Sequence, residues 1–286
     1  MDFKNMKLSD LTKEQLIDIV KVQKRNLDLQ ENFLINISHD LRSPVNSILS
    51  VLQCLKYLNG DNSKEIKEKT NEYRKIIKRN SLKIIKLIDN LIDTTKLEGE
   101  NYKLNKTDID IVNVVESIVD SIEVYANQKN INIIFDTNVE EFIINADLEA
   151  IDRIVMNLLS NAIKFSPIDE TIEVTLNAEK NKVHISVKDN GMGIAEEEQK
   201  KIFNRFEQAT NSKRIEGKGS GIGLDLVSYL VKGHGGKIEL KSKLNEGSEF
   251  IVTLPIGKLN IIEEKHELMS RNKVEQLEIE FSDIYL

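Results

Sequence analysis

The sequence predicts a multidomain protein in which a long α-helical hairpin is followed by an α/β domain. Apolar residues repeat in heptads over most of the first 100 residues, segments of strand and helix periodicity alternate after Asn105, and glycines punctuate the later part of the chain. A single helical hairpin leaves half of its apolar stripe uncovered. We therefore expect two chains to pair into a dimeric four-helix bundle.

The first predicted helix carries the seam of a coiled coil. Seam positions step by four and three from residue 16, pass Pro44 and end at residue 58, just before the turn sequence Asn-Gly-Asp-Asn at 59–62. A second stripe, at residues 66–91, predicts another helix that ends near residue 98. Together they predict the two arms of the hairpin.

The rest of the chain alternates between strand and helix patterns. The predicted strands include the start of KTDID, INIIFDT, EFIINAD, the hairpin TIEVTLNAE–KVHISVKD, and the final pair KIELKSK and EFIVTLP. The segment KTDIDIVNVVESIVDSIEVYANQK predicts a short strand followed by a helix, and the other predicted helices are LEAIDRIVMNLLSNAIKF and IGLDLVSYLVKG. Near the end, Leu277, Ile279 and Phe281 alternate as in a strand with one apolar face.

Composition excludes several classes of protein. The net charge of −7 argues against nucleic-acid binding, which depends on neutralising phosphates with basic side chains. The sequence has neither an uninterrupted apolar run of membrane-helix length nor the apolar core of a signal peptide, so we expect no membrane segment and a cytoplasmic location. Its one cysteine, Cys54, lies among apolar residues and is predicted to be a buried thiol in a reducing compartment.

His39 is the first candidate for chemistry. At about 100° per residue, it lies opposite the seam residues Ile37 and Leu41, so its ring is predicted to face solvent. Asp40 could fix the tautomer of the ring and make the other nitrogen a better nucleophile. Pro44 has no N–H for the Asp40 carbonyl, which predicts a bend just past the histidine without ending the helix. A bend without function is the alternative.

Helix LEAIDRIVMNLLSNAIKF places Asn157, Asn161 and Lys164 within an arc of about 60°, opposite its apolar side. Two carboxamides and an ammonium on one stripe suit a phosphate and a hard cation such as Mg²⁺, which keeps waters and phosphates as its other ligands. An ordinary solvated face is the equally weighted alternative for this helix alone.

Two glycine-punctuated segments complete the candidate site. Asp189 stands at a strand end before Gly191 and Gly193, where backbone can approach a flat ring while the carboxylate accepts from an exocyclic amine. Downstream, a glycine-rich stretch enters a helix whose free N–H groups attract phosphate, with glycines at Gly217, Gly219, Gly221 and Gly223. A Rossmann motif is disfavoured because these glycines follow no strand of a parallel βαβ unit.

In this order, the segments resemble the conserved boxes of the sensor histidine kinases of two-component signalling. FLINISHDLRSPV resembles the phosphoacceptor box, NLLSNAIKF the asparagine box, DNGMGI the first glycine box, IFNRFEQ the phenylalanine box and GKGSGIGL the second glycine box. The family implies a dimerisation and histidine-phosphotransfer bundle. Next comes an ATP-binding α/β sandwich of the Bergerat type, which Hsp90, gyrase B and the mismatch-repair ATPases share.

The resemblance also implies roles for individual residues. His39 would be the phosphoacceptor, Asp40 its orienting base, Asn161 the Mg²⁺ ligand and Asp189 the partner of the adenine amine. The implied nucleotide-binding residues also comprise Asn157, Lys164, Phe165, Gly191, Gly193, Ile194, Phe206, Gly217, Gly219, Gly221, Ile222, Gly223 and Leu224, and Phe203 would join Phe206 in anchoring the lid.

Two positions depart from the family pattern. The family usually has threonine or asparagine at the position of Ser43, where the side chain places a hydrolytic water, so phosphatase activity is in doubt. Many members carry an arginine at the position of Gln208, and Arg205 or Lys218 could replace it.

The expected organisation is a coiled-coil lead-in helix at 1–30, a phosphotransfer domain at 31–98, an ATP-binding domain at 107–257 and a tail of unassigned role at 258–286. The expected activity is ATP-dependent autophosphorylation of His39 in a homodimer, followed by transfer to a response regulator receiver domain. An upstream sensor domain or protein would supply the signal. The alternatives are a nucleotide-holding scaffold without transfer and a chaperone-like or repair ATPase, which would lack the histidine hairpin.

Overall fold

The computed structural model describes residues 12–57, 64–98, 103–204, 207, 222–259 and 271–282. The chain divides into two compact units at residues 1–43 and 44–286, and the boundary falls inside the first helix. No helix in the described ranges combines the length and apolar character needed to span a bilayer.

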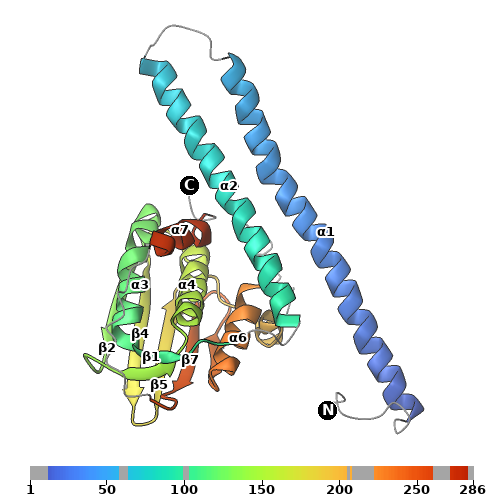
Figure 1. Cartoon of the computed structure of the whole chain (residues 1–286), viewed down its shortest axis with the longest axis vertical. Helices are drawn as coiled ribbons and strands as arrows, with labels where there is room; N and C mark the ends of the chain where they lie inside the picture. Colours follow the sequence, from blue (N-terminus) through green and yellow to red (C-terminus); the bar gives the residue numbers. More distant parts are fainter. Residues whose placement is uncertain are drawn as a thin grey trace. The chain divides into compact units, whose positions relative to one another are not determined.

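Two long helices come first. Helix α1 spans Lys13–Tyr57 and continues through Pro44, and helix α2 spans Lys64–Glu98 (Figure 1). Seam residues Ile37 and Val51 of α1 are buried, whereas the seam residues Val20, Leu27 and Leu34 are exposed in the single chain. Cys54 is exposed, so its prediction as a buried thiol was wrong. It lies three residues past Val51, at the edge of the seam rather than in it, about 60° around the helix axis.

The α/β part contains the expected alternation of elements. Its strands are β1 Thr107–Asp110, β2 Asn132–Thr137, β3 Ile143–Ala146, β4 Thr171–Glu179, β5 Lys182–Asp189, β6 Lys237–Ser242 and β7 Ser248–Pro255. Its helices are α3 Ile111–Ala126, α4 Leu148–Phe165, α5 Glu196–Gln199 and α6 Gly223–Gly233, with 3₁₀ turns at Asn127–Lys129 and Lys201–Phe203.

Five strands form one mixed sheet in the order β2-β4-β5-β7-β6, and β1 pairs with β3 in a separate two-stranded sheet. Strands β2 and β4 are parallel, whereas the other neighbours in the large sheet are antiparallel. Helices α3, α4 and α6 contact the large sheet (Figure 1). The core between these helices and the sheet is formed by fully buried aliphatic side chains such as Ile118, Leu158, Leu176 and Val252.

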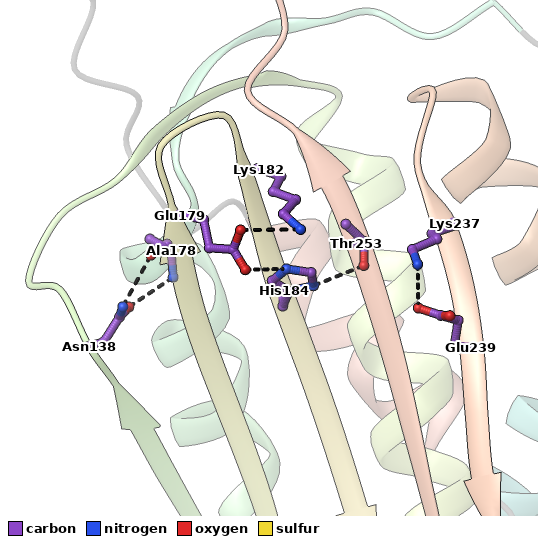
Figure 2. Close-up of polar contacts among 8 residues, drawn as sticks. All are labelled: Asn138, Ala178, Glu179, Lys182, His184, Lys237, Glu239 and Thr253. Carbon is purple, nitrogen blue, oxygen red and sulfur yellow. Dashed lines mark hydrogen bonds and ion pairs between the residues drawn. The ribbon is translucent and has the colours of Figure 1, made fainter.

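Along each strand, side chains alternate between the core and a polar face of the sheet, because successive residues point to opposite sides. Figure 2 shows the polar contacts on that face. His184 of β5 contacts Thr253 Oγ1 through Nδ1 at 2.9 Å and Glu179 Oε1 through Nε2 at 3.1 Å. Both ring nitrogens therefore have protein partners, which fits a structural role for this histidine.

The tail contains a helix, α7, Arg271–Glu280, so the strand predicted there was wrong. Leu277 and Phe281 are both buried, and residues four apart lie on one face of a helix. Ile279, which a strand would place on the same face as these two, is only half-buried. A spacing of four puts two residues on one face in either a helix or a strand, so Ile279 alone distinguishes them, and its apolar side chain misled the prediction.

Candidate functional site

His39 lies on α1 with its side chain 79% exposed. Ile37, two residues earlier, is only 6% exposed, so the prediction that the histidine faces away from the buried seam is confirmed. The ring Nδ1 lies 3.7 Å from Asp40 Oδ1. This distance exceeds a hydrogen bond but keeps the carboxylate within ion-pair range of the ring. A reagent approaching from solvent can therefore reach the imidazole.

Helix α4 carries the largest group of predicted site residues. Its N-terminus is capped by Asp147, whose Oδ1 accepts a hydrogen bond from Ala150 N at 3.0 Å, and such a cap typically stabilises a helix by about 1 kcal/mol. Asn157, Asn161 and Lys164 are half-buried. The opposite side is buried in the core, as predicted, at Val155, Leu158, Leu159, Ala162 and Ile163.

His234, at the end of α6, holds the start of α4 in place. Its Nε2 accepts a hydrogen bond from Asp147 N at 3.0 Å, and its Nδ1 lies 2.8 Å from Leu230 O. Because a carbonyl can only accept, Nδ1 carries the proton and the ring is neutral. Burial accordingly lowers the pKa of His234. These two hydrogen bonds fit a structural role for His234, and its link to the α4 cap could not be predicted from the glycine turn around it.

Lys129 holds the other end of α4, and sequence reasoning missed it. Its Nζ donates to the carbonyls of Ile163, Lys164 and Ser166 at 2.8, 3.1 and 3.1 Å. The last carbonyls of a helix lack helical partners and favour a cation. Burial lowers the pKa of Lys129. The contact spans more than 30 residues of sequence, so no local pattern marks it.

The loop after β5 brings Asp189 close to the end of α4. Asp189 is 6% exposed, and its Oδ1 accepts a hydrogen bond from Gly191 N at 2.8 Å. A Cβ at Gly191 would lie 2.7 Å from Phe165 O, so only glycine allows this approach. Burial raises the pKa of the Asp189 carboxyl. Asp189 and the backbone of Phe165 are therefore brought to the same corner of the domain.

The same loop is tied to strand β6. Gly193 has a positive φ of 62°, and a Cβ there would lie 1.9 Å from Lys243 O. Ile194 N donates to Ser242 Oγ at 2.8 Å, and Gln199 Nε2 donates to Ser242 O at 2.8 Å. Glycine at position 193 thus permits a turn that other residues rarely adopt.

Helix α6 begins directly against α4. A Cβ at Gly223 would lie 2.4 Å from Asn157 Oδ1, so the glycine lets the two helices meet. Asn157 Nδ2 donates to Arg153 O at 3.0 Å, which leaves its oxygen turned toward Gly223. Ile222 is fully buried and Leu224 packs against the core. The predicted residues of α4 and of the second glycine segment therefore meet at Asn157.

Several predicted residues lie outside the described part of the chain. These are Phe206, Gly217, Gly219 and Gly221, together with Arg205, Gln208 and Lys218. Phe203 is described, and its ring packs edge-on against Phe250 with centroids 6.3 Å apart.

The half-buried face of α4 thus carries two carboxamides and an ammonium; the start of α6 meets this face at Asn157, and the buried carboxylate of Asp189 lies near the backbone of Phe165 at the end of the helix. A carboxylate can accept from an amine on a flat ring, and carboxamide oxygens suit a hard cation. The N-terminal N–H groups of α6 favour an anion. This combination of donors and acceptors fits a nucleotide.

Two family models match this chain. Residues 29–100 match the His Kinase A (phospho-acceptor) domain, and residues 146–258 match the histidine kinase-, DNA gyrase B- and HSP90-like ATPase. The chain belongs to the sensor histidine kinases. Helices α1 and α2 supply the phospho-acceptor match, and the face built from α4, the loop after β5 and α6 lies in the ATP-binding match.

Curated sensor kinases match most of this chain. Sensor histidine kinase WalK of Bacillus subtilis strain 168 is 27% identical over 84% of this chain and 39% of its own length. Sensor protein KdpD of Clostridium acetobutylicum is 34% identical over 86% of this chain and 26% of its own length. The chain therefore spans less than half the length of these sensor kinase relatives.

A solved histidine kinase shares the fold. The crystal structure of histidine kinase ThkA in complex with response regulator protein TrrA aligns with a TM-score of 0.54 at 22% identity. The alignment covers 86% of this chain and 68% of ThkA. Helical and α/β parts in this order are thus shared with that sensor histidine kinase.

Proposed function

We propose that this chain is an ATP-dependent protein-histidine autokinase that phosphorylates its own His39 and passes the phosphoryl group to an aspartate of a response regulator receiver domain. The observation that carries the proposal is the exposed His39, with Asp40 at 3.7 Å, inside the matched phospho-acceptor domain. The same chain supplies an ATP-binding domain.

The proposed chemistry needs a nucleophilic ring nitrogen and a positioned γ-phosphate. With the Nδ1 proton turned toward Asp40, the lone pair of Nε2 attacks the γ-phosphorus of ATP. The new N–P bond forms while the bond from the γ-phosphorus to the bridging oxygen breaks, and ADP leaves. Asp40 favours the positive charge that develops on the ring. Transfer of this kind depends mostly on positioning and charge neutralisation.

We assign the nucleotide to the face described above. Asp189 would accept from the adenine amine, and the glycines of the loop after β5 would let backbone approach the ring. Asn161 would hold Mg²⁺, and Asn157 and Lys164 would lie near the phosphates. The half-buried position of these side chains on one side of α4 supports the assignment. When bound, the cation would neutralise phosphate charge.

We also propose a homodimer built from α1 and α2. In a single chain, apolar side chains on both helices remain exposed to solvent: Val45 is 41% exposed, Leu49 52%, Leu52 44%, Ile88 44% and Ile92 43%. Such rows normally mark an interface. Sedimentation at micromolar concentration should give twice the chain mass of 32.7 kDa. A monomer under those conditions would contradict the dimer.

The remaining parts of the proposal concern partners and place. A structural relative, ThkA, was solved in complex with response regulator TrrA, which supports a regulator as the phosphoryl acceptor here. An upstream sensor domain or partner protein, as the source of the signal, stays a prediction. A cytoplasmic location stays a prediction, and so does the reduced phosphatase activity expected from serine at position 43.

Labelled ATP with Mg²⁺ tests the proposal directly. The full chain should acquire phosphate that is labile in acid and stable in base, and His39→Ala should abolish this label. His184→Gln is the matched control, because His184 lies on the polar face of the sheet with both nitrogens bonded, and this variant should retain full labelling. Label that survives in His39→Ala would overturn the proposal.

A further inference from the structure

Helix α7 lies beyond both family matches, which end at residues 100 and 258. Its apolar side nevertheless belongs to the core of the ATP-binding domain. Leu277 is 5% exposed and Phe281 is fully buried. The Phe281 ring stacks on Tyr125 of α3, with centroids 4.9 Å apart and planes inclined by 26°. This stacking of two buried aromatic rings anchors α7 to α3 of the ATP-binding domain.

The acidic side of α7 contacts α2. Glu278 Oε1 lies 2.6 Å from Lys78 Nζ, and Glu280 Oε1 lies 3.5 Å from Lys86 Nζ. Lys86 Nζ also donates to the backbone carbonyl of Glu280 at 2.5 Å. Both helices belong to the compact unit 44–286. One short helix thus touches the ATP-binding domain with its apolar side and helix α2 of the phospho-acceptor domain with its charged side.

The two ion pairs differ in their surroundings. The side chains of Lys86 and Glu280 are 16% and 20% exposed, whereas those of Lys78 and Glu278 are 61% and 28% exposed. Water and salt screen the outer pair, which contributes little by itself. The inner pair is shielded and includes a bond to a backbone carbonyl, so breaking it leaves a partly buried charge without its partner. We expect the inner pair to dominate the contact.

We propose that α7 is an intramolecular fastening that holds the ATP-binding domain to α2, through Glu278 and Glu280 on Lys78 and Lys86. A helix anchored in the ATP-binding domain and ion-paired to α2 adds a contact between them that does not run through the chain from α2 to β1, and so restricts how the two can move relative to each other. The meaning of this restriction for phosphoryl transfer rests on the proposed function, but the fastening itself does not.

A charge swap tests the fastening without requiring ATP. Spin labels are attached to cysteines introduced at exposed positions 71 on α2 and 188 on β5, in the full chain carrying Cys54→Ser. Double electron–electron resonance should give a narrow distribution of the distance between the two labels in this parent protein. Lys86→Glu should broaden it, Glu280→Lys should broaden it as well, and the two together should restore much of the original width.

Matched controls keep the result interpretable. Lys241→Glu breaks an ion pair of the sheet face, Lys241 Nζ to Glu249 Oε2 at 3.1 Å, and should leave the distribution unchanged. Circular dichroism should show that every variant is folded. The proposal would be overturned if the distance distribution were as wide in the parent as in the two single charge-reversal variants. It would also be overturned if the distribution of the double variant were as broad as those of the single variants. If the parent gave the narrow distance distribution but acquired no phosphate from ATP, the proposed function would be refuted and the role of α7 would stand.

Discussion

His234 and Asp147 join the two helices that frame the candidate nucleotide site, because the ring Nε2 of His234 accepts the backbone N–H of Asp147 at 3.0 Å. Asp147 in turn caps α4 and accepts a second hydrogen bond, from Asn105 N, at 2.7 Å. A neutral imidazole at the end of α6 therefore fixes the first turn of α4, several turns away from Asn161.

This bond predicts a dependence of stability on pH. Burial lowers the pKa of His234 below its ordinary value of 6.5, so the unfolded chain binds the proton more readily. The stabilising contribution is present above pH 6.5 and is lost as pH falls toward the lowered pKa. In thermal unfolding, wild type should lose its advantage over His234→Gln between about pH 7 and pH 5. Parallel curves for the two proteins would contradict this.

Asp189 predicts the opposite slope. Burial raises its pKa above 3.8, so the folded chain holds the proton more tightly than the unfolded chain. The contribution is complete below pH 3.8 and is lost as pH rises through the raised pKa. The melting temperature of wild type minus that of Asp189→Asn should therefore decrease from pH 4 to pH 7. A difference that stays constant would show that the carboxylate is not penalised by burial.

Asp189→Asn should also weaken nucleotide binding, since an amide nitrogen replaces an acceptor for the adenine amine. Calorimetry with a non-hydrolysable ATP analogue at pH 7 measures the loss. Glu173→Gln, a carboxylate on the polar sheet face paired with Lys188 at 3.1 Å, is the matched control and should bind normally. Undiminished binding by Asp189→Asn would refute the adenine assignment.

Asn161→Ala tests the assigned cation ligand. Autophosphorylation should fall by about two orders of magnitude or more, as for other losses of a charge-stabilising group. The Mg²⁺ concentration required for half-maximal nucleotide binding should rise. Asn113→Ala changes an exposed asparagine of α3 and should leave both quantities unchanged. An unaltered Mg²⁺ requirement in Asn161→Ala would remove this residue from the metal site.

Phe281→Ala tests whether α7 is part of the core. Removing a fully buried aromatic ring typically lowers the free energy of unfolding by about 3–5 kcal/mol. Glu275→Ala, an exposed position on the same helix, should change it by less than about 0.5 kcal/mol. Denaturant titration of the full chain measures both values. If the two substitutions lowered the free energy of unfolding equally, α7 would not be part of the core.

Much of the fold could be predicted because its elements have strong periodicity. The stripe on α4 and the alternation on β4 and β5 are long enough to distinguish helix from strand. The prediction for the tail was wrong for the opposite reason, because this segment has few apolar residues. The spacing of Leu277, Ile279 and Phe281 fits a strand, and that of Leu277 and Phe281 also fits a helix. Cys54 failed because apolar neighbours in sequence do not share a helix face.

The site was predictable only where local chemistry is distinctive. Carboxamides on one helix stripe and an aspartate before glycines each suggest a purpose from their own sequence. Lys129 and His234 act on helix ends that are remote in sequence, so their partners become visible only after folding. Residues assigned to ligand binding could thus be proposed from the sequence, whereas the residues that hold α4 in place could not.

Helix α1 continues without a break from Lys13 to Tyr57, with His39 between its ends. A rotation of the helix about its axis at the N-terminal end would therefore also rotate the segment that carries His39. Each residue inserted ahead of the histidine would turn the ring by about 100° about the axis, and seven would return it almost to its starting direction. A signal that arrives through this end of α1 would therefore act as a rotation of His39. In a series of variants with one to seven inserted residues, autophosphorylation would then vary with the helical period.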